Sequence, residues 1–384
     1  MARQTGSYRI TTSAGEEVRA FIPAPLPPAD PPLDVEALSG ALSEALSALD
    51  LLAVAGSVVP DTAWFLYGFV RKEAVISSQI EGTQATLRDV AAFEATASSE
   101  RPEDVEEVCN YVEALRYARA QLAKPAGLPL STRLLCEVHR VLMTGARGAD
   151  KLPGEVRRSQ NWIGGTRPGT ARFVPPPHEE VPGALAALEK WIHSDDPLPP
   201  LIKAGIAHVQ FETIHPFLDG NGRVGRMLIT LLVEHWGLLP APLLYLSLAF
   251  KSRQQEYYAR LAAVRDEGDW EGWSDFFLAC VADAARDGVR VAKALHEIVG
   301  EDRRRVVGAA GTTVAAIRLL DLLPANPIVT VQRAAELLGL TAPPARKAID
   351  LLEAQGVLRE TSGKQRDRVY AYHHYLRALT GEGV

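Results

Sequence analysis

The stretch TIHPFLDGNGRVGRM, residues 213–227, gathers one histidine, one acid, an asparagine between two glycines and two arginines immediately before a run with helical spacing. The glycine-rich segment Gly220–Gly222 leads directly into this predicted helix. Backbone N–H groups at a helix N-terminus face outward, and the helix dipole there favours an anion. The stretch therefore predicts a loop that binds phosphate.

The side chains around this loop have the chemistry of a phosphoryl-type transfer site. Arg223 and Arg226 are three residues apart on one predicted helix face, which suits two phosphate groups on one chain. Asp219 is placed to hold Mg²⁺, which prefers oxygen ligands, and His215 can act as a general base. Each feature alone is typical of a turn, a tight loop or a solvated face. Their joint occurrence favours the functional interpretation.

The motif HPFLDGNGRVGR resembles the complete signature of the Fic family, His-x-Phe-x-(Asp/Glu)-Gly-Asn-Gly-Arg-x-x-Arg, with every fixed position filled. The resemblance extends over most of the chain, from the proline-rich N-terminal region to the C-terminal tail. It implies a mainly α-helical fold: a Fic-type helical bundle with a small β-hairpin flap, followed by a winged helix-turn-helix domain. It also implies a protein adenylyltransferase that moves AMP from ATP, its co-substrate, to a Tyr, Thr or Ser hydroxyl of a protein.

The resemblance assigns roles to the matching positions. His215 would deprotonate the target hydroxyl, which attacks the α-phosphorus while pyrophosphate leaves, and Asp219 would hold the cofactor Mg²⁺. Arg223 would stabilise charge on the α- and β-phosphates, and Arg226 would orient the γ-phosphate. This division of labour agrees with the chemistry, because phosphoryl-type transfer depends mainly on positioning and charge stabilisation. The residues expected to cradle the phosphates are Gly220, Asn221 and Gly222.

Two further segments resemble substrate-binding parts of the family. In RRSQNWIGGTRPGTARFVPPP, residues 157–177, glycine and proline turn signals separate short apolar segments and predict a β-hairpin. It resembles the flap, whose edge would bind a target backbone by β-augmentation, with a purely structural hairpin as the alternative. The segment QQEYYARL resembles a region that lines the adenine pocket, so Tyr257 or Tyr258 would stack on the base unless both belong to the core. The expected target-docking residues are Ile163, Gly164, Gly165 and Thr166.

The segment VISSQIEGTQATL contains a match to the family's inhibitory pattern, (Ser/Thr)-x-x-x-Glu-(Gly/Asn), in which the fixed positions are Ser77, Glu81 and Gly82. The resemblance implies that Glu81 pairs with Arg226. A carboxylate there occupies the guanidinium and repels the γ-phosphate, so that ATP binds in an unproductive pose. We therefore expect an autoinhibited enzyme. Whether Glu81 also supports the removal of AMP stays open at the level of sequence.

The chain is expected to divide into three parts: residues 1–100 with an N-terminal arm and the inhibitory helix, residues 101–300 with the Fic core, and residues 311–384 with the winged helix. In residues 1–34 the prolines of FIPAPLPPADPPLD disfavour a helix and predict an extended segment. This segment is either a disordered leader or an arm that lies over a domain, and we favour the arm. In the tail, two short helices across GLTAP precede two β-prone segments around SGKQRD, the order of a winged helix-turn-helix.

The winged helix leaves its partner open between DNA and another protein. Arg346 and Lys347 lie on the predicted recognition helix, where phosphate contacts are expected. Acidic residues interleave with the basic ones, which leaves little net positive charge. The basic residues on or near the wing are Lys364, Arg366 and Arg368. The interleaved acids are Glu336, Asp350, Glu353, Glu360 and Asp367.

Two alternative functions keep the same fold. One is a phosphotransferase, although relatives that act as kinases carry Lys where Gly222 stands, so that Gly222 argues against it. The other is a DNA-binding regulator whose Fic core senses nucleotide, and the intact His215, Asp219 and Arg226 argue against a catalytically dead core. The chain itself is one candidate target, and a homodimer is one candidate assembly.

The bulk composition is that of an ordinary folded protein, since 47% of the 384 residues are hydrophobic and 23% are charged. The formal net charge of -6 provides no global positive field for nucleic acid. Three widely spaced cysteines argue against a disulfide framework or a zinc site. The N-terminus lacks a signal-like pattern and the chain lacks an uninterrupted apolar run of about 18 residues. We therefore expect a cytoplasmic protein that does not enter a membrane.

Overall fold

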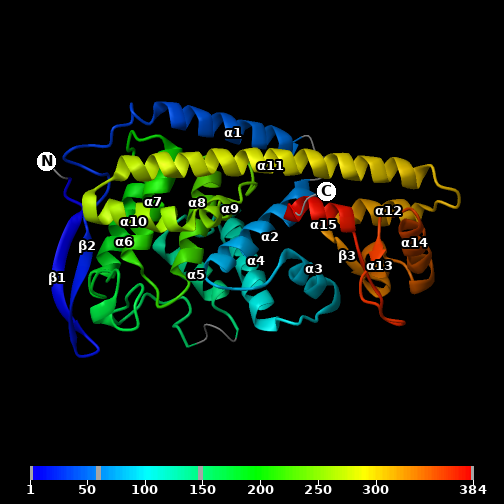
Figure 1. The fold of residues 1–384 in the computed structure, drawn as a ribbon, viewed down its shortest axis with the longest axis horizontal. Helices are drawn as coiled ribbons and strands as arrows, with labels where there is room; N and C mark the ends of the chain where they lie inside the picture. Colours follow the sequence, from blue (N-terminus) through cyan, green and yellow to red (C-terminus); the bar gives the residue numbers. More distant parts are fainter. Residues whose placement is uncertain (1–2, 58–61, 146–149, 382–384) are drawn as a thin grey trace. The chain divides into compact units, whose positions relative to one another are not determined.

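The computed structural model describes residues 3–57, 62–145 and 150–381, and it confirms the mainly helical fold with small antiparallel sheets (Figure 1). The chain divides into two compact units whose segments alternate along the sequence. The first consists of Met1–Asp50, Cys109–Pro240 and Leu246–Ala284, and the second of Leu51–Val108, Ala241–Tyr245 and Ala285–Val384. The three-part division expected from the sequence stays a prediction.

Helix α7 (Pro200–Ile214) lies at the centre of the first unit, and every residue from Leu201 to Ile214 is buried. A helix with apolar residues on all its faces is stable only inside a core. The other elements of this unit are β1 (Gly6–Ser13), β2 (Glu16–Pro23), the first part of α1 (Ser39–Ser57), the last part of α4 (Pro102–Ala123), α5 (Thr132–Leu142), the 3₁₀ turn η1 (Pro168–Thr170), α6 (Val181–Ile192), α8 (Asn221–His235), α9 (Ser247–Ser252), α10 (Gln254–Glu267) and the first part of α11 (Trp270–Val307).

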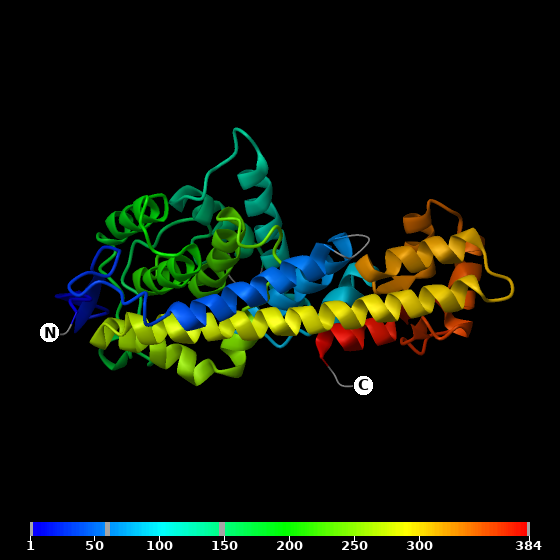
Figure 2. The same cartoon turned by 90° about the horizontal axis from the view of Figure 1, so that it is seen from above.

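Glycines let the neighbours of α7 approach closely. A Cβ on Gly205 of α7 would lie 2.8 Å from Cδ1 of Phe277 in α11, and a Cβ on Gly225 of α8 would lie 2.4 Å from Oε1 of Glu212 in α7. Nε1 of Trp273 also donates a hydrogen bond to Gly205 O at 3.0 Å. These contacts fix α8 and α11 against α7, and thereby fix both ends of the loop that joins α7 to α8. Figure 2 shows α11 as one long helix.

The N-terminal arm begins as a β-hairpin, a feature that the sequence interpretation did not include. Strands β1 and β2 pair antiparallel from Gly6↔Pro23 to Ser13↔Glu16, around a turn at Ala14. The hairpin is attached to the first unit, because the N–H of Phe21 donates to Val174 O at 2.9 Å. The proline-rich segment follows this hairpin.

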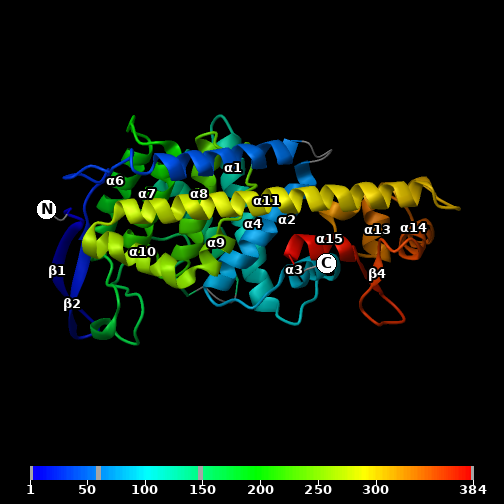
Figure 3. The same ribbon diagram turned by 45° about the horizontal axis from the view of Figure 1, so that its top comes forward.

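The C-terminal part of the second unit has the predicted winged-helix order (Figure 3). Two helices, α13 (Val331–Leu338) and α14 (Ala342–Ala354), precede strands β4 (Arg359–Glu360) and β5 (Val369–Ala371), and the sheet order is β3-β5-β4. The other elements of this unit, besides the remaining parts of α1, α4 and α11, are α2 (Thr62–Ile80), α3 (Leu87–Thr96), α12 (Val314–Leu322), the 3₁₀ turn η2 (Leu323–Ala325), β3 (Ile328–Thr330) and α15 (His373–Thr380).

Basic residues in the winged helix are partly engaged by nearby acids. On α14 the Nε of Arg346 donates to Asp350 at 3.1 Å, and on α13 Arg333 pairs with Glu336 at 3.3 Å. In the wing, the Glu360 carboxylate accepts a bond from the N–H of Ser362 at 2.7 Å and shapes the turn. The partner of this domain stays a prediction.

Within the described residues, α1 is the one helix that is long and apolar enough to cross a membrane by length and composition. Of the window tested, 28% is buried. One helix of this kind is weak evidence for a span, since core helices of other proteins meet the same test.

Candidate functional site

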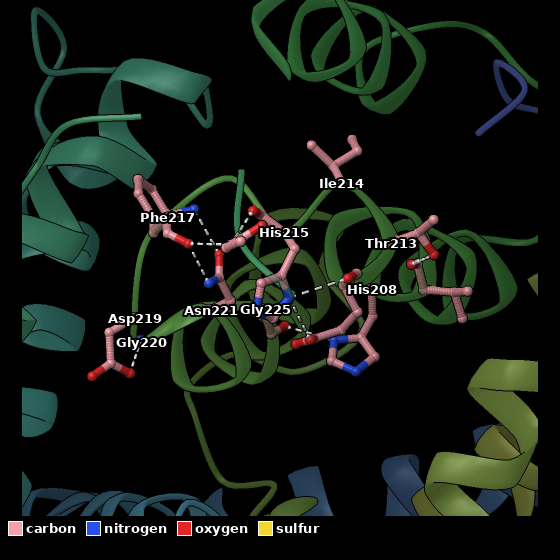
Figure 4. Close-up of polar contacts among 12 residues, drawn as sticks. His208, Thr213, Ile214, His215, Phe217, Asp219, Gly220, Asn221 and Gly225 are labelled. Atoms are coloured by element: carbon pink, nitrogen blue, oxygen red, sulfur yellow. Dashed lines mark hydrogen bonds and ion pairs between the residues drawn. The ribbon is translucent and has the colours of Figure 1, made fainter. Parts of the chain in front are cut away.

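The loop between α7 and α8 begins at His215, which ends α7 in the left-handed conformation with φ of 50° (Figure 4). Its backbone N–H still donates to Phe211 O at 2.9 Å. Nδ1 lies 3.3 Å from Glu212 O and 3.9 Å from Oε2 of the same residue, and the side chain is 19% exposed. With the proton on Nδ1, the ring donates to Glu212 O and Nε2 is the basic atom. This geometry suits a general base.

Asn221, at the first position of α8, holds the loop closed. Its Oδ1 accepts a bond from the N–H of Phe217 and its Nδ2 donates to Phe217 O, both at 2.8 Å (Figure 4). The Asn221 side chain is buried, and the Phe217 ring is buried in the core. The side chain of Asn221 therefore shapes the loop, and only its backbone N–H remains relevant to a phosphate.

A histidine that the sequence analysis missed, His139 of α5, supports the other end of the loop. Its Nε2 lies 3.1 Å from Asp219 O, its Nδ1 accepts a bond from the N–H of Gly154 at 2.9 Å, and its ring stacks on Phe217 at 3.9 Å between centroids. Burial lowers the pKa of His139 to about 4. The ring is therefore neutral near pH 7, with its proton on Nε2 directed at Asp219 O.

Asp219 has the features of a ligand for a divalent cation. Its side chain is 51% exposed, and Oδ1 accepts a bond from the N–H of Gly220 at 2.6 Å while lying 3.7 Å from Nη2 of Arg223. Among the described residues, no group of three or more potential ligands surrounds it. A single accessible carboxylate fits Mg²⁺, which commonly binds one or two carboxylates together with substrate phosphates.

The N-terminus of α8 follows directly from this carboxylate. Gly220 has a φ of 74°, and a Cβ there would lie 3.0 Å from Sδ of Met143, so a side chain would be both strained and crowded. Gly222 is half-buried. Arg223 and Arg226 are buried, with only 5% and 3% of their surface exposed. A buried guanidinium suits a phosphate, because the low local dielectric strengthens the contact.

The flap contains one bridged pair where a longer hairpin was expected. Ile163 and Phe173 pair antiparallel, with N–H to O distances of 2.8 and 3.2 Å. After this pair in the chain, Pro175 has no N–H to donate to a longer ladder, and toward the tip Gly165 is left-handed with φ of 79°. The exposed tip comprises Gly164, Gly165 and Thr166. Its role in docking a target stays a prediction.

The prediction that Tyr257 stacks on adenine is wrong in this structure. Tyr257 is 1% exposed, its hydroxyl lies 2.8 Å from Nε2 of His208, and its ring stacks against Phe250 at 4.6 Å. The ring belongs to the aromatic core, which was the alternative interpretation. Tyr258 is 47% exposed and is the tyrosine of this pair that a ligand can reach.

The predicted inhibitory residues lie at the C-terminal end of α2, in the second unit. Ser77 is fully buried, whereas Glu81 and Gly82 are exposed in the turn that follows the helix, where Gly82 has a φ of 103°. The N–H of Glu81 donates to Ser78 O at 3.0 Å. The pairing of Glu81 with Arg226 stays a prediction, since Arg226 belongs to the first unit.

Parts of this chain match known proteins. Residues 129–233 match the model of the Fic/DOC family, and residues 39–120 match that of the Fic/DOC family N-terminal region. The protein adenylyltransferase Fic of Drosophila grimshawi is 27% identical over 206 residues, which are 52% of this chain and 39% of that protein. Its counterpart in Drosophila erecta is 26% identical over 206 residues, 52% of this chain and 38% of that protein. The chain thus spans about two fifths of the length of these curated relatives.

Solved structures share the fold. A Fic family protein from Desulfovibrio desulfuricans superimposes with a TM-score of 0.55 at 23% identity, covering 87% of this chain and 95% of that one. Fic-1 from C. elegans gives a TM-score of 0.52 at 23% identity, covering 68% of this chain and 75% of that one. At these identities the likeness concerns the fold.

Proposed function

The chain belongs to the Fic/DOC family, and on that premise we propose that it is a protein adenylyltransferase that transfers AMP from ATP to a Tyr, Thr or Ser hydroxyl of a protein. One observation supports this most strongly. The loop between α7 and α8 carries a partly exposed histidine and an exposed carboxylate, and it leads into the glycine-rich N-terminus of α8, whose first turns carry two buried arginines. These are the groups that nucleotidyl transfer requires.

In the proposed reaction, Nε2 of His215 takes the proton from the target hydroxyl, whose oxygen attacks the α-phosphorus. The bond between the α-phosphorus and the bridging oxygen breaks, and pyrophosphate leaves. Arg223 and the N-terminus of α8 stabilise charge on the phosphate oxygens, and Arg226 orients the γ-phosphate. Asp219 would hold Mg²⁺, which supplies positive charge to the phosphates when bound.

We also propose that Glu81 restrains this activity. A carboxylate that pairs with Arg226 would compete with the γ-phosphate for the same guanidinium. The supporting observation is local to α2, since the motif sits at a helix end where Ser77 is buried and Glu81 is exposed. Such a residue can contact a partner without unfolding the helix that carries it.

The experiment that tests the proposed function compares ATP labelled at the α-phosphate with ATP labelled at the γ-phosphate. Wild type, Glu81→Gly and His215→Ala are each incubated with Mg²⁺ and a cell lysate, and intact mass is measured in parallel. We expect transfer of the α label, strongest in Glu81→Gly and absent in His215→Ala. Transfer of the γ label alone would make the protein a phosphotransferase, and transfer of neither label would contradict the proposal.

A further inference from the structure

Two residues at the start of the flap, Arg157 and Asn161, form hydrogen bonds to the loop between α7 and α8. Four consecutive carbonyl groups, from Ile214 at the end of α7 to Phe217 in the loop, accept hydrogen bonds from these two residues of the flap. Arg157 donates through Nε, Nη2 and its backbone N–H, and Asn161 donates through Nδ2. The acceptors are Ile214 O at 3.5 Å, His215 O at 2.9 Å, Pro216 O at 2.9 Å and Phe217 O at 3.0 Å.

The guanidinium of Arg157 also bonds to the two chain segments of the flap, one before its tip and one after it. Nη1 of Arg157 donates to Ser159 O at 3.0 Å, before the tip, and Nη2 donates to Pro176 O at 2.6 Å, after it. Arg157 is only 2% exposed. One buried side chain therefore bonds to the loop of His215 and to both legs of the segment expected to present the target.

The loop needs such support because His215 has a left-handed backbone. A non-glycine residue in this conformation is strained and persists only where surrounding contacts hold it. Asn221 fixes Phe217 on the α8 side, while Arg157 and Asn161 fix the carbonyls on the flap side. Loss of the flap-side bonds would let the loop relax without removing any group that contacts ATP.

We propose that Arg157 is a positioning residue for AMP transfer, which holds the backbone of His215 in a fixed relation to the flap. This inference rests on the proposed function and extends it to a residue outside the motif. The flap would present the target hydroxyl and His215 would accept its proton, so the distance between these two groups depends on the Arg157 bonds. Arg157 itself contacts no reacting atom.

Arginine suits this position for a geometric reason. Its planar fork carries five N–H donors, whereas a lysine offers three donors from one nitrogen. The acceptors surround the guanidinium on several sides, so a single ammonium cannot reach all of them. Burial lowers the pKa of Arg157 to about 10, which still leaves it charged at neutral pH.

The test compares Arg157→Lys with Arg158→Lys, because the neighbouring arginine is 78% exposed and bonds to Glu155 at 2.6 Å. Both changes are made in the Glu81→Gly chain, and self-labelling by α-labelled ATP is measured against ATP concentration. We expect Arg157→Lys to lower the maximal rate by about 10- to 100-fold, as misplacement of a catalytic group does. The ATP concentration for half-maximal rate should change by less than about twofold, and Arg158→Lys should match its parent.

A second readout does not require any transfer activity. Hydrogen exchange is measured at the amides of His215 and Phe217 in the same chains without nucleotide, and we expect faster exchange in Arg157→Lys than in Arg158→Lys. If no chain transfers the α label to itself or to a lysate protein, the proposed function fails while the exchange still decides the positioning role. Equal exchange in the two variants, or a loss confined to the ATP dependence of the rate, overturns the inference. If Arg157→Lys does not fold, Asn161→Ala takes its place with the same expected results.

Discussion

Asn221 illustrates how one buried amide determines the shape of the site. Replacing it by Asp keeps an acceptor for the N–H of Phe217 but removes the donor to Phe217 O, and the new charge is buried. An unsatisfied buried group costs about 1–3 kcal/mol, so we expect Asn221→Asp to lose at least that much unfolding free energy together with AMP transfer. Denaturant unfolding and self-labelling by α-labelled ATP measure the two effects.

The control for this change is Asn110→Asp, which removes one donated bond to Thr144 O at 2.5 Å. That bond is exposed, so water can replace it, and we expect a change within about 0.5 kcal/mol. Equal losses in the two variants would show that the Asn221 bonds do not shape the loop.

At the level of single residues, the motif could be predicted from sequence because its members are adjacent in the chain. His215, Asp219 and Arg226 need no tertiary information to be recognised together. Arg157 and His139 could not be found in this way. Each reaches the loop from a distant segment, and neither differs in sequence from an ordinary surface arginine or a core histidine. The prediction for Tyr257 failed because the aromatic residues that bury its ring lie on other helices, which the sequence of its own segment does not reveal.

The packing of α7 against α8 makes the first unit sensitive to acid. His208 of α7 is fully buried, with Nδ1 2.9 Å from Gly225 O of α8, and burial lowers its pKa to about 3. Between pH 6.5 and 3 the unfolded chain binds a proton here that the folded chain does not. Stability is therefore fully present above pH 6.5 and falls as the pH drops, by about 2 kcal/mol at pH 5.

We expect His208→Gln to flatten this dependence by about the same amount, although it lowers stability at pH 7. The unfolding free energy is measured by denaturant titration at pH 7 and pH 5, followed by tryptophan fluorescence. His296→Gln provides the control, because His296 is exposed. If the unfolding free energy changes equally with pH in wild type and in His208→Gln, burial does not hold the His208 ring neutral.

Arg3, which precedes the N-terminal hairpin, bonds to residues near the start of α11, a contact that sequence periodicity cannot predict. Arg3 is 9% exposed and donates to Pro31 O, Pro32 O and Gly268 O, and also to both carboxylate oxygens of Glu271 at the start of α11. The bonds from Arg3 lower the pKa of Glu271 to about 2. Charge-assisted bonds of this kind contribute about 1.5–3 kcal/mol.

We expect Arg3→Ala to weaken the attachment of the hairpin, so that proteolysis cleaves residues 3–34 faster while the helical core stays intact. Arg9→Ala is the matched control, because Arg9 pairs with Glu180 at the surface, where the two side chains are 51% and 37% exposed, respectively. Equal protection of the hairpin in both variants would contradict this prediction. The sequence indicated an arm from its prolines, but the attachment of the hairpin involves Val174 of the flap, far along the chain.

Over the whole molecule, the order of helices and the winged-helix tail could be predicted, because helical spacing and turn signals are local. The division into two units could not, since segments distant in the chain combine in each. The second unit unites α2, which carries the predicted inhibitory motif, with the winged helix. A Cβ on Gly68 of α2 would lie 2.8 Å from Cδ1 of Leu379 in α15, so these two helices are in close contact.

This contact connects the stability of the second unit to the proposed restraint by Glu81. Gly68→Leu overpacks the contact with α15 and should destabilise the second unit by about 1–3 kcal/mol. Because α2 leads directly into Glu81, we expect a higher rate of self-labelling in the otherwise wild-type chain and no further rise in the Glu81→Gly chain. Adding Leu379→Ala to Gly68→Leu makes room for the new side chain and should restore the low rate. A rise of equal size with and without Glu81 would mean that α2 affects the rate by a route other than this glutamate.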